Sequence, residues 1–190
     1  MARAARKIAE PGLDRASALD GRAACQPWVS VMPAGPAGRL SLRAPRETVA
    51  ALSQALGLDL PEKPTTSAAG KDRAALWLGP DEWLVIDESG ADLPALLAGV
   101  TAFHSAVDVS HRNLGILVAG EGAEATLASG CPRDLSLAAF PVGSCARTVL
   151  GKVEIVVWRT GEDAFRVECW RSFSDYVFSF LAEAARDAGT

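Results

Sequence analysis

Short runs of apolar residues, bounded by glycine, proline and polar residues, recur along the chain and predict β-strands. The runs at 74–78 and 82–87 are separated only by the turn residues 79–81, which is typical of a β-hairpin. The runs at 153–159 and 164–170 flank another short polar turn and predict a second hairpin. We therefore expect the chain to be rich in antiparallel strand pairs.

Single strands are predicted at 27–31, 39–43 and 113–119. Residues 39–43 alternate between polar and apolar, as in a strand with one buried face, whereas 113–119 is mostly apolar. The proline- and glycine-rich stretch 33–38 indicates a turn or linker between the first two strands.

Apolar residues spaced as on one face of a helix predict helices at 45–57, 93–100 and 122–129. The first of these is expected to begin at Pro45 and to end at Gly57, because glycine suits the left-handed conformation that often follows a helix.

The closing segment 172–187 predicts a strongly amphipathic helix. Ser172 and Asp175 approximate a capping box at its start, with Asp in place of the usual Glu or Gln. Its apolar positions predict one buried stripe, formed by Phe173, Tyr176, Val177, Phe180, Leu181 and Ala184.

The order of predicted elements repeats along the chain, which suggests an internal duplication. We expect one domain over 25–187 made of two similar halves, at about 25–105 and 106–187. Antiparallel hairpins with helices gathered on one face favour the α+β class over a doubly wound sheet. Residues 1–24 lack hydrophobic periodicity and predict a flexible N-terminal arm, because such a segment has no apolar face to bury.

The overall charge argues against two classes of partner. The formal net charge is −4 and the pI is near 5.2, so neither a nucleic acid nor an anionic membrane is expected to bind. The arm carries five basic residues, as organellar transit peptides do, but its three acidic residues disfavour that interpretation. With no apolar run long enough for a membrane span, we expect a cytoplasmic protein.

Sites for cofactors and metals are not indicated. The segment 120–130 contains a G-x-G but lacks the third glycine of a dinucleotide-binding fingerprint. The four cysteines form no C-x-x-C pair and are expected to be buried. A metal site built from three of them and a histidine has no spacing that zinc sites use; it would comprise Cys131, Cys145, Cys169 and His111.

A hydrolase is not favoured either. Asp108, Ser110 and His111 lie close together in the sequence, but successive strand residues point to opposite faces, and no G-x-S-x-G is present. We therefore predict no catalytic, cofactor-binding or metal-binding residue in this chain.

Several motifs in fixed order make the chain resemble a known family. They are GPDEWLVI at 79–86, DVSHR at 108–112, GCPRDL at 130–135, CARTVL at 145–150 and RSFSDYVFSFL at 171–181. Over about 25–187, the chain is similar to the gamma subunit of heterotetrameric sarcosine oxidase.

The DVSH motif and the helix after it also resemble the folate-binding domain of the glycine cleavage T-protein family. That resemblance implies an α+β fold of two similar, strand-swapped halves, the aminomethyltransferase folate-binding domain fold. The T-protein pattern GG-I-x-DD is replaced here by GKVEIVVW, with one glycine, Gly151, and one carboxylate, Glu154. The departure argues against independent one-carbon transfer.

The resemblance implies a non-catalytic gamma subunit of a complex that oxidatively demethylates sarcosine, or a related N-methyl amino acid, to glycine. Its partners would be alpha, beta and delta subunits, which would hold FAD, FMN, NAD, zinc and tetrahydrofolate. No activity and no cofactor are expected for the isolated chain. The alternatives are an autonomous tetrahydrofolate-binding, aminomethyltransferase-like protein and a stand-alone interaction domain.

Polar and aromatic residues within or beside these motifs predict the partner interface. Tryptophan and arginine are enriched where protein partners bind tightly. The expected interface residues are Asp81, Trp83, His111, Arg112 and Arg171. A core position for Trp83, or an ion pair within the domain for Arg171, is the competing interpretation.

Overall fold

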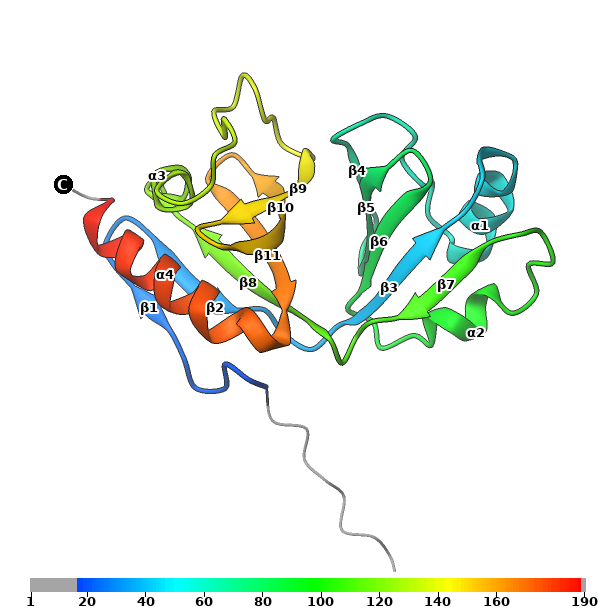
Figure 1. Cartoon of the computed structure of the whole chain (residues 1–190), viewed down its shortest axis with the longest axis horizontal. Helices are drawn as coiled ribbons and strands as arrows, with labels where there is room; N and C mark the ends of the chain where they lie inside the picture. Colours follow the sequence, from blue (N-terminus) through cyan, green and yellow to red (C-terminus); the bar gives the residue numbers. More distant parts are fainter. Residues whose placement is uncertain (1–16, 189–190) are drawn as a thin grey trace, which may run out of the picture.

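Two antiparallel sheets, each with helices on one face, form the described part of the chain (Figure 1). The computed structural model describes residues 17–188. One sheet has five strands, in the order β4-β5-β6-β3-β7, and the other has six, in the order β1-β2-β8-β11-β10-β9. The predicted α+β class and both predicted hairpins, β5–β6 and β10–β11, are confirmed.

In the two hairpins, the observed strand bounds agree closely with the predicted ones. The five-stranded sheet contains β3 (Gly38–Arg43), β4 (Ser67–Ala69), β5 (Arg73–Gly79), β6 (Glu82–Asp87) and β7 (Ser105–Asp108). The six-stranded sheet contains β1 (Ala24–Cys25), β2 (Ser30–Pro33), β8 (Asn113–Ala119), β9 (Cys145–Leu150), β10 (Val153–Gly161) and β11 (Ala164–Trp170).

The helices cover the outer faces of the sheets. In Figure 1, α1 (Val49–Leu56) and α2 (Leu93–Leu97) lie against the five-stranded sheet, and α3 (Ala123–Ala128) and α4 (Ser174–Asp187) against the six-stranded one. Gly57 ends α1 with a φ of 64°, as predicted. None of the helices within 17–188 combines the length and the apolar content that crossing a membrane requires.

Strands are exchanged between the two halves. β2 pairs with β8 in the six-stranded sheet, although it comes before every strand of the five-stranded sheet. β7 pairs with β3 and thus belongs to the five-stranded sheet. The predicted halves, 25–105 and 106–187, are therefore wrong in their bounds: one unit is 38–108, and the other combines 17–33 with 113–188.

The predicted arm is also too long. Residues 1–16 lie outside the described residues, but 17–24 are part of the fold. Leu19 is 0% exposed in the core of the six-stranded unit, and the Arg22 guanidinium pairs with Asp175 of α4. One apolar side chain, that of Leu19, anchors this segment in the core. A single leucine forms no hydrophobic periodicity, so the sequence pattern does not predict the anchor.

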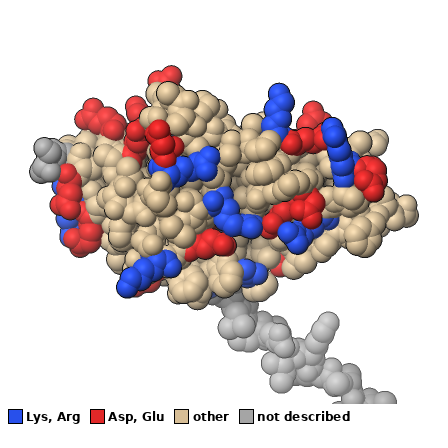
Figure 2. All heavy atoms as spheres, turned by 45° about the horizontal axis from the view of Figure 1, so that its top comes forward, with Lys and Arg blue, Asp and Glu red and all other residues tan. Residues whose placement is uncertain are grey.

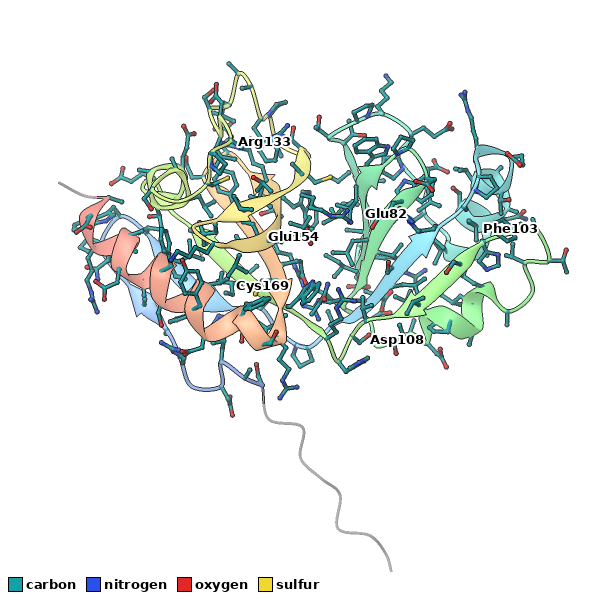
Figure 3. All side chains as sticks on the ribbon, viewed as in Figure 1. Glu82, Phe103, Asp108, Arg133, Glu154 and Cys169 are labelled. Carbon is teal, nitrogen blue, oxygen red and sulfur yellow. The ribbon has the colours of Figure 1, made fainter. Side chains whose placement is uncertain are left out.

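Charged side chains of both signs are interspersed on the face shown in Figure 2, and no region of one sign dominates it. Two labelled carboxylates, Glu82 of β6 and Glu154 of β10, lie in the gap between the two sheets (Figure 3). The halves therefore meet along their sheet faces, opposite to the helices.

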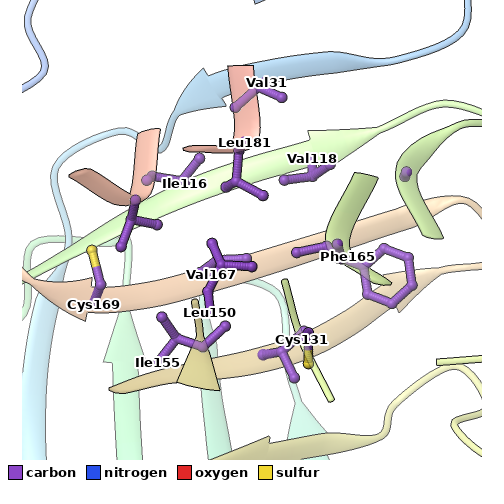
Figure 4. Packing of buried hydrophobic residues seen from close by; sticks show 14 of the residues in the cluster. Val31, Ile116, Val118, Cys131, Leu150, Ile155, Phe165, Val167, Cys169 and Leu181 are labelled. Atoms are coloured by element: carbon purple, nitrogen blue, oxygen red, sulfur yellow. The ribbon is translucent and has the colours of Figure 1, made fainter. Parts of the chain in front are cut away.

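Three apolar clusters stabilise this arrangement. The largest lies between the six-stranded sheet and its helices and includes Ile116, Val167 and Leu181 (Figure 4). A second one lies on the helix side of the five-stranded sheet. The third joins the inner faces of both sheets; its buried members are Leu76, Leu84, Ile86, Val109, Cys145 and Val156.

The predicted buried stripe of the closing helix is partly wrong. Phe173 and Tyr176 are 42% and 40% exposed. The helix begins at Ser174, after a 3-10 turn at Arg171–Phe173, and the expected capping box is not formed, since no side chain caps it. The buried positions are Ser174, Val177, Phe178, Leu181, Ala184 and Ala185.

Candidate functional site

A buried ion-pair network connects the two halves. The Arg39 guanidinium of β3 donates to both carboxylate oxygens of Glu168 in β11, from Nε at 2.6 Å and from Nη2 at 3.2 Å. Arg166 Nε donates to the same carboxylate at 2.8 Å. Glu168 and Arg39 are 2% and 4% exposed, so these charges are held away from water.

The network shifts the pKa of Arg166. Desolvation alone would lower the pKa of this buried guanidinium, but attraction to Glu168 and hydrogen bonds to Glu168 and Glu88 outweigh it and raise the pKa. Gly115 pairs with Glu168 in the ladder and leaves the room that the network needs. A Cβ there would lie 2.7 Å from Glu168 Oε1, too close for any other residue without a shift.

A cleft of about 100 Å³ lies next to this network, between the inner faces of the sheets. Glu82 lines it and accepts hydrogen bonds from Arg43, at 3.2 Å, and from Arg147. Desolvation raises the pKa of Glu82, but Arg147 and Arg43 outweigh it, so the pKa lies below the ordinary value. Glu154 and Trp170 also line the cleft.

Three of the five predicted interface residues come together at the end of the six-stranded sheet. His111, Arg112 and Arg171 are exposed, and the backbone N–H of Arg171 donates to the Arg112 carbonyl at 2.6 Å. The Arg112 guanidinium lies 4.0 Å from the centre of the Trp170 ring, which in turn stacks on Phe173 at 6.0 Å. We call these five residues, His111, Arg112, Trp170, Arg171 and Phe173, the aromatic edge.

The other two predicted residues lie in the five-stranded sheet. Asp81 is exposed, and its Oδ1 lies 4.0 Å from Arg43 Nη2. Trp83 is 1% exposed, and its Nε1 donates to the Pro61 carbonyl at 2.7 Å. The expectation that Trp83 offers its ring to a partner is therefore wrong for this structure, because alternation along β6 directs the ring into the helix-side core.

The cysteines are mostly buried, as predicted, with the exception of the exposed Cys25. Burial raises the pKa of the Cys145 and Cys169 thiols to about 12, so both are poor nucleophiles. Within residues 17–188, no group of three or more His, Cys, Asp or Glu side chains is placed to hold a metal ion.

The sequence reasoning missed Glu168, Arg39 and Arg166. One signal was present: Arg166 and Glu168 are two apart in a strand that is otherwise mostly apolar. Alternation puts both on one face, and burying two charges on that face requires partners from another element.

A family model and curated relatives match most of the chain. The model of the sarcosine oxidase gamma subunit family matches residues 43–187. The gamma subunit of Corynebacterium sp. (strain P-1) is 33% identical over 138 residues, which cover 71% of this chain and 68% of that protein. The gamma subunit of an Arthrobacter species is 34% identical over 140 residues, with the same coverage.

Solved structures extend the likeness to the fold. A chain of the heterotetrameric sarcosine oxidase from Corynebacterium sp. U-96, in complex with pyrrole 2-carboxylate, superposes with a TM-score of 0.83 at 28% identity, covering 91% of this chain and 92% of that chain. The glycine cleavage aminomethyltransferase T from Bartonella henselae shares the fold, with a TM-score of 0.60 at 14% identity over 81% of this chain and 45% of that one. The predicted strand-swapped aminomethyltransferase-like fold is confirmed, and the chain belongs to the sarcosine oxidase gamma subunit family.

Proposed function

We propose that this chain is an accessory gamma subunit of a heterotetrameric sarcosine oxidase-like complex, in which it contributes to assembly. One observation carries the proposal: 91% of the chain superposes on 92% of a chain from the solved heterotetrameric oxidase. The match includes nearly all of both chains, so the resemblance is that of whole subunits.

The complex would oxidatively demethylate sarcosine, or a related N-methyl amino acid, to glycine in the cytoplasm. Its alpha, beta and delta subunits would hold FAD, FMN, NAD, zinc and tetrahydrofolate. The interior of this chain supports a structural role, because its deepest charges, Arg39, Arg166 and Glu168, bind one another. A guanidinium or carboxylate held in such an ion pair is poorly suited to act as a general acid or base in catalysis.

The aromatic edge is the surface that we propose for docking. Trp170 is 41% exposed and Phe173 42%; the Trp170 ring lies against the Arg112 guanidinium and stacks on the Phe173 ring. Exposed tryptophan next to arginine has the composition of interface hot spots, since burying the ring against a partner removes apolar area from water while arginine supplies hydrogen bonds. Asp81 remains a predicted contact at the edge of the other sheet.

Co-expression with the three other subunits tests the proposal. Affinity purification of this chain should recover the flavin-bearing subunits, and sarcosine-dependent peroxide should form only in their presence. Sarcosine oxidation by the isolated chain would contradict an accessory role. Tight binding of a reduced folate by the isolated chain, without recovery of other subunits, would favour the aminomethyltransferase-like alternative.

A further inference from the structure

Strand β7 is an edge strand, and its outer side pairs with no other strand of residues 17–188. It ends the order β4-β5-β6-β3-β7 and pairs only with β3. Next to β7, the N–H of Val109 donates to the Arg39 carbonyl at 2.9 Å. Bonded and non-bonded positions alternate in an antiparallel ladder, so Val107 also bonds to β3, whereas the N–H and C=O of Ala106 point away from the sheet. β7 therefore offers backbone hydrogen bonds along an open edge.

In the other half of the molecule, the corresponding edge is occupied. The order β7-β3-β6-β5-β4 recurs in the six-stranded sheet as β2-β8-β11-β10-β9, so β2 is the counterpart of β7 (Figure 1). The outer edge of β2 pairs with one more strand, β1, in antiparallel orientation, with Ala24 opposite Val31. The fold thus provides a place for an added strand on both sheets, and residues 17–188 fill it on only one of them.

The surface around the open edge is uncharged and apolar. Residues 93–107 contain no Asp, Glu, Lys or Arg. Phe103, two residues before β7, is 84% exposed, and Val107 within the strand is 53% exposed. Edge strands are commonly protected from pairing by charged residues or proline, but in β7 only the last residue, Asp108, is charged. An apolar edge without this protection is typical of a surface that binds an extended segment.

The open edge leads directly into the surface proposed for docking. After β7 the chain turns, with the N–H of Arg112 donating to the Val109 carbonyl at 3.0 Å, and His111 and Arg112 of the aromatic edge follow within four residues of Asp108. Figure 1 shows this connection between β7 and β8 at the centre of the molecule. A partner bound at the aromatic edge therefore lies near the end of β7.

We infer that β7 receives an additional antiparallel strand from a partner subunit, an inference that rests on the proposed function. The added strand is apolar at alternate positions, so that one of its faces covers Val107, and its backbone bonds to Ala106 as β1 bonds to β2.

Two other occupants of the edge fit less well. In the proposed heterotetramer of alpha, beta, gamma and delta subunits, each subunit occurs once, so no second copy of β7 is present to pair with the first. Residues 1–16 carry six charged side chains, which an uncharged apolar edge does not match.

Hydrogen–deuterium exchange tests the inference on the full chain, alone and in the complex purified after co-expression with the other three subunits. Mass spectrometry with residue-resolved fragmentation follows the amide hydrogens of β7. The N–H of Ala106 should exchange freely in the chain alone and at least about tenfold more slowly in the complex. The N–H of Val107, which bonds to β3 in both samples, should be protected in both and serves as the internal reference.

A proline substitution tests the same hydrogen bond through affinity. Ala106→Pro removes the outward donor, and proline is tolerated in an edge strand where the N–H faces away from the sheet. The melting temperature of the chain alone should therefore stay the same, whereas the affinity for the other subunits should fall about tenfold. The matched control is Ala69→Pro in β4, the opposite edge strand, where the bond from the Gly70 N–H to the Arg73 carbonyl implies that the Ala69 N–H also points outward. This control should leave the affinity unchanged.

The outcomes separate the inference from the proposed function. A complex in which Ala106 exchanges as fast as in the chain alone overturns the inference and leaves the assembly role standing, whereas failure to recover the other subunits overturns both. Protection of Ala106 in the chain alone also overturns it: protection that is lost on dilution indicates a second copy, and protection that persists indicates residues 1–16. If Ala106→Pro lowers the melting temperature, the exchange comparison on the unchanged chain decides.

Discussion

Replacing Glu168 by glutamine should destabilise the fold strongly, because one carboxylate compensates two buried guanidinium groups. The substitution keeps the shape and removes the charge that Arg39 Nε and Arg166 Nε contact at 2.6 and 2.8 Å. Arg166 retains Glu88, but Arg39 loses its anionic partner among residues 17–188 and keeps neutral acceptors, the Ala37 carbonyl at 3.0 Å and at most the amide oxygen of the substituted side chain. Leaving a buried charge without its partner typically lowers the free energy of unfolding by about 3 to 5 kcal/mol.

For a chain of this size, each kcal/mol shifts the melting temperature by about 2 to 4 °C, so Glu168→Gln should lower it by about 6 to 20 °C. Thermal unfolding followed by circular dichroism measures the shift. The matched control is Glu183→Gln, which removes an exposed ion pair to Arg186 on α4 and should change the stability by less than about 0.5 kcal/mol.

A second variant separates the charge effect from a packing effect. Arg39→Met combined with Glu168→Gln removes the unpaired guanidinium, so it should recover part of the stability that Glu168→Gln loses. The reasoning is refuted if Glu168→Gln melts at the same temperature as Glu183→Gln. It is also refuted if the double variant loses more free energy of unfolding than Arg39→Met and Glu168→Gln lose together.

Three further predictions concern other parts of the molecule. Phe173→Ala in the aromatic edge should weaken subunit association by about 2 kcal/mol with little change in melting, whereas Trp83→Ala should lower the free energy of unfolding by about 3 to 5 kcal/mol with unchanged affinity of the folded fraction. Asp87 accepts hydrogen bonds from Ser89 and Arg73, and these outweigh desolvation and hold its pKa below the ordinary 3.8. The stabilisation by the Asp87 carboxylate is complete above the ordinary pKa of 3.8 and is lost as the pH falls through the lower folded-state pKa. As the pH is lowered, the free energy of unfolding should therefore fall less steeply in Asp87→Asn than in the unchanged chain. A thiol reagent in mildly alkaline buffer should modify Cys25 rapidly in the native chain and react slowly with the buried thiols, Cys131, Cys145 and Cys169; fast labelling of all four would contradict the burial.

Local features of the fold were predictable because their causes are local. Strand alternation depends on neighbouring residues, so the hairpins at 74–87 and 153–170 were found with nearly correct bounds. Gly57 was identified as the end of α1 because a left-handed residue after a helix favours glycine wherever the helix lies. β7 was missed, since its four residues are too few to display a period.

The candidate site was less predictable, because burial depends on which strands pair. Trp83 and Trp170 occupy similar places beside charged residues in the sequence, yet one is 1% and the other 41% exposed. The difference arises because Trp83 faces the helices of its own unit, whereas Trp170 lies at the open end of β11, where the chain turns into α4. Neither orientation can be derived from a hairpin alone, since both faces of the strand carry apolar residues.

The sequence by itself determined the α+β class, the hairpins, the positions of the four helices and, through motifs in fixed order, the family. Only the tertiary structure decided that β2 crosses into the six-stranded sheet, that Arg39 reaches Glu168 at a separation of 129 residues, and that Glu154 and Arg112 line one cleft. The physical reason is the range along the chain over which each interaction acts. Periodicity and turn chemistry act over a few residues, whereas the partner of a buried charge is chosen by the packing of entire sheets.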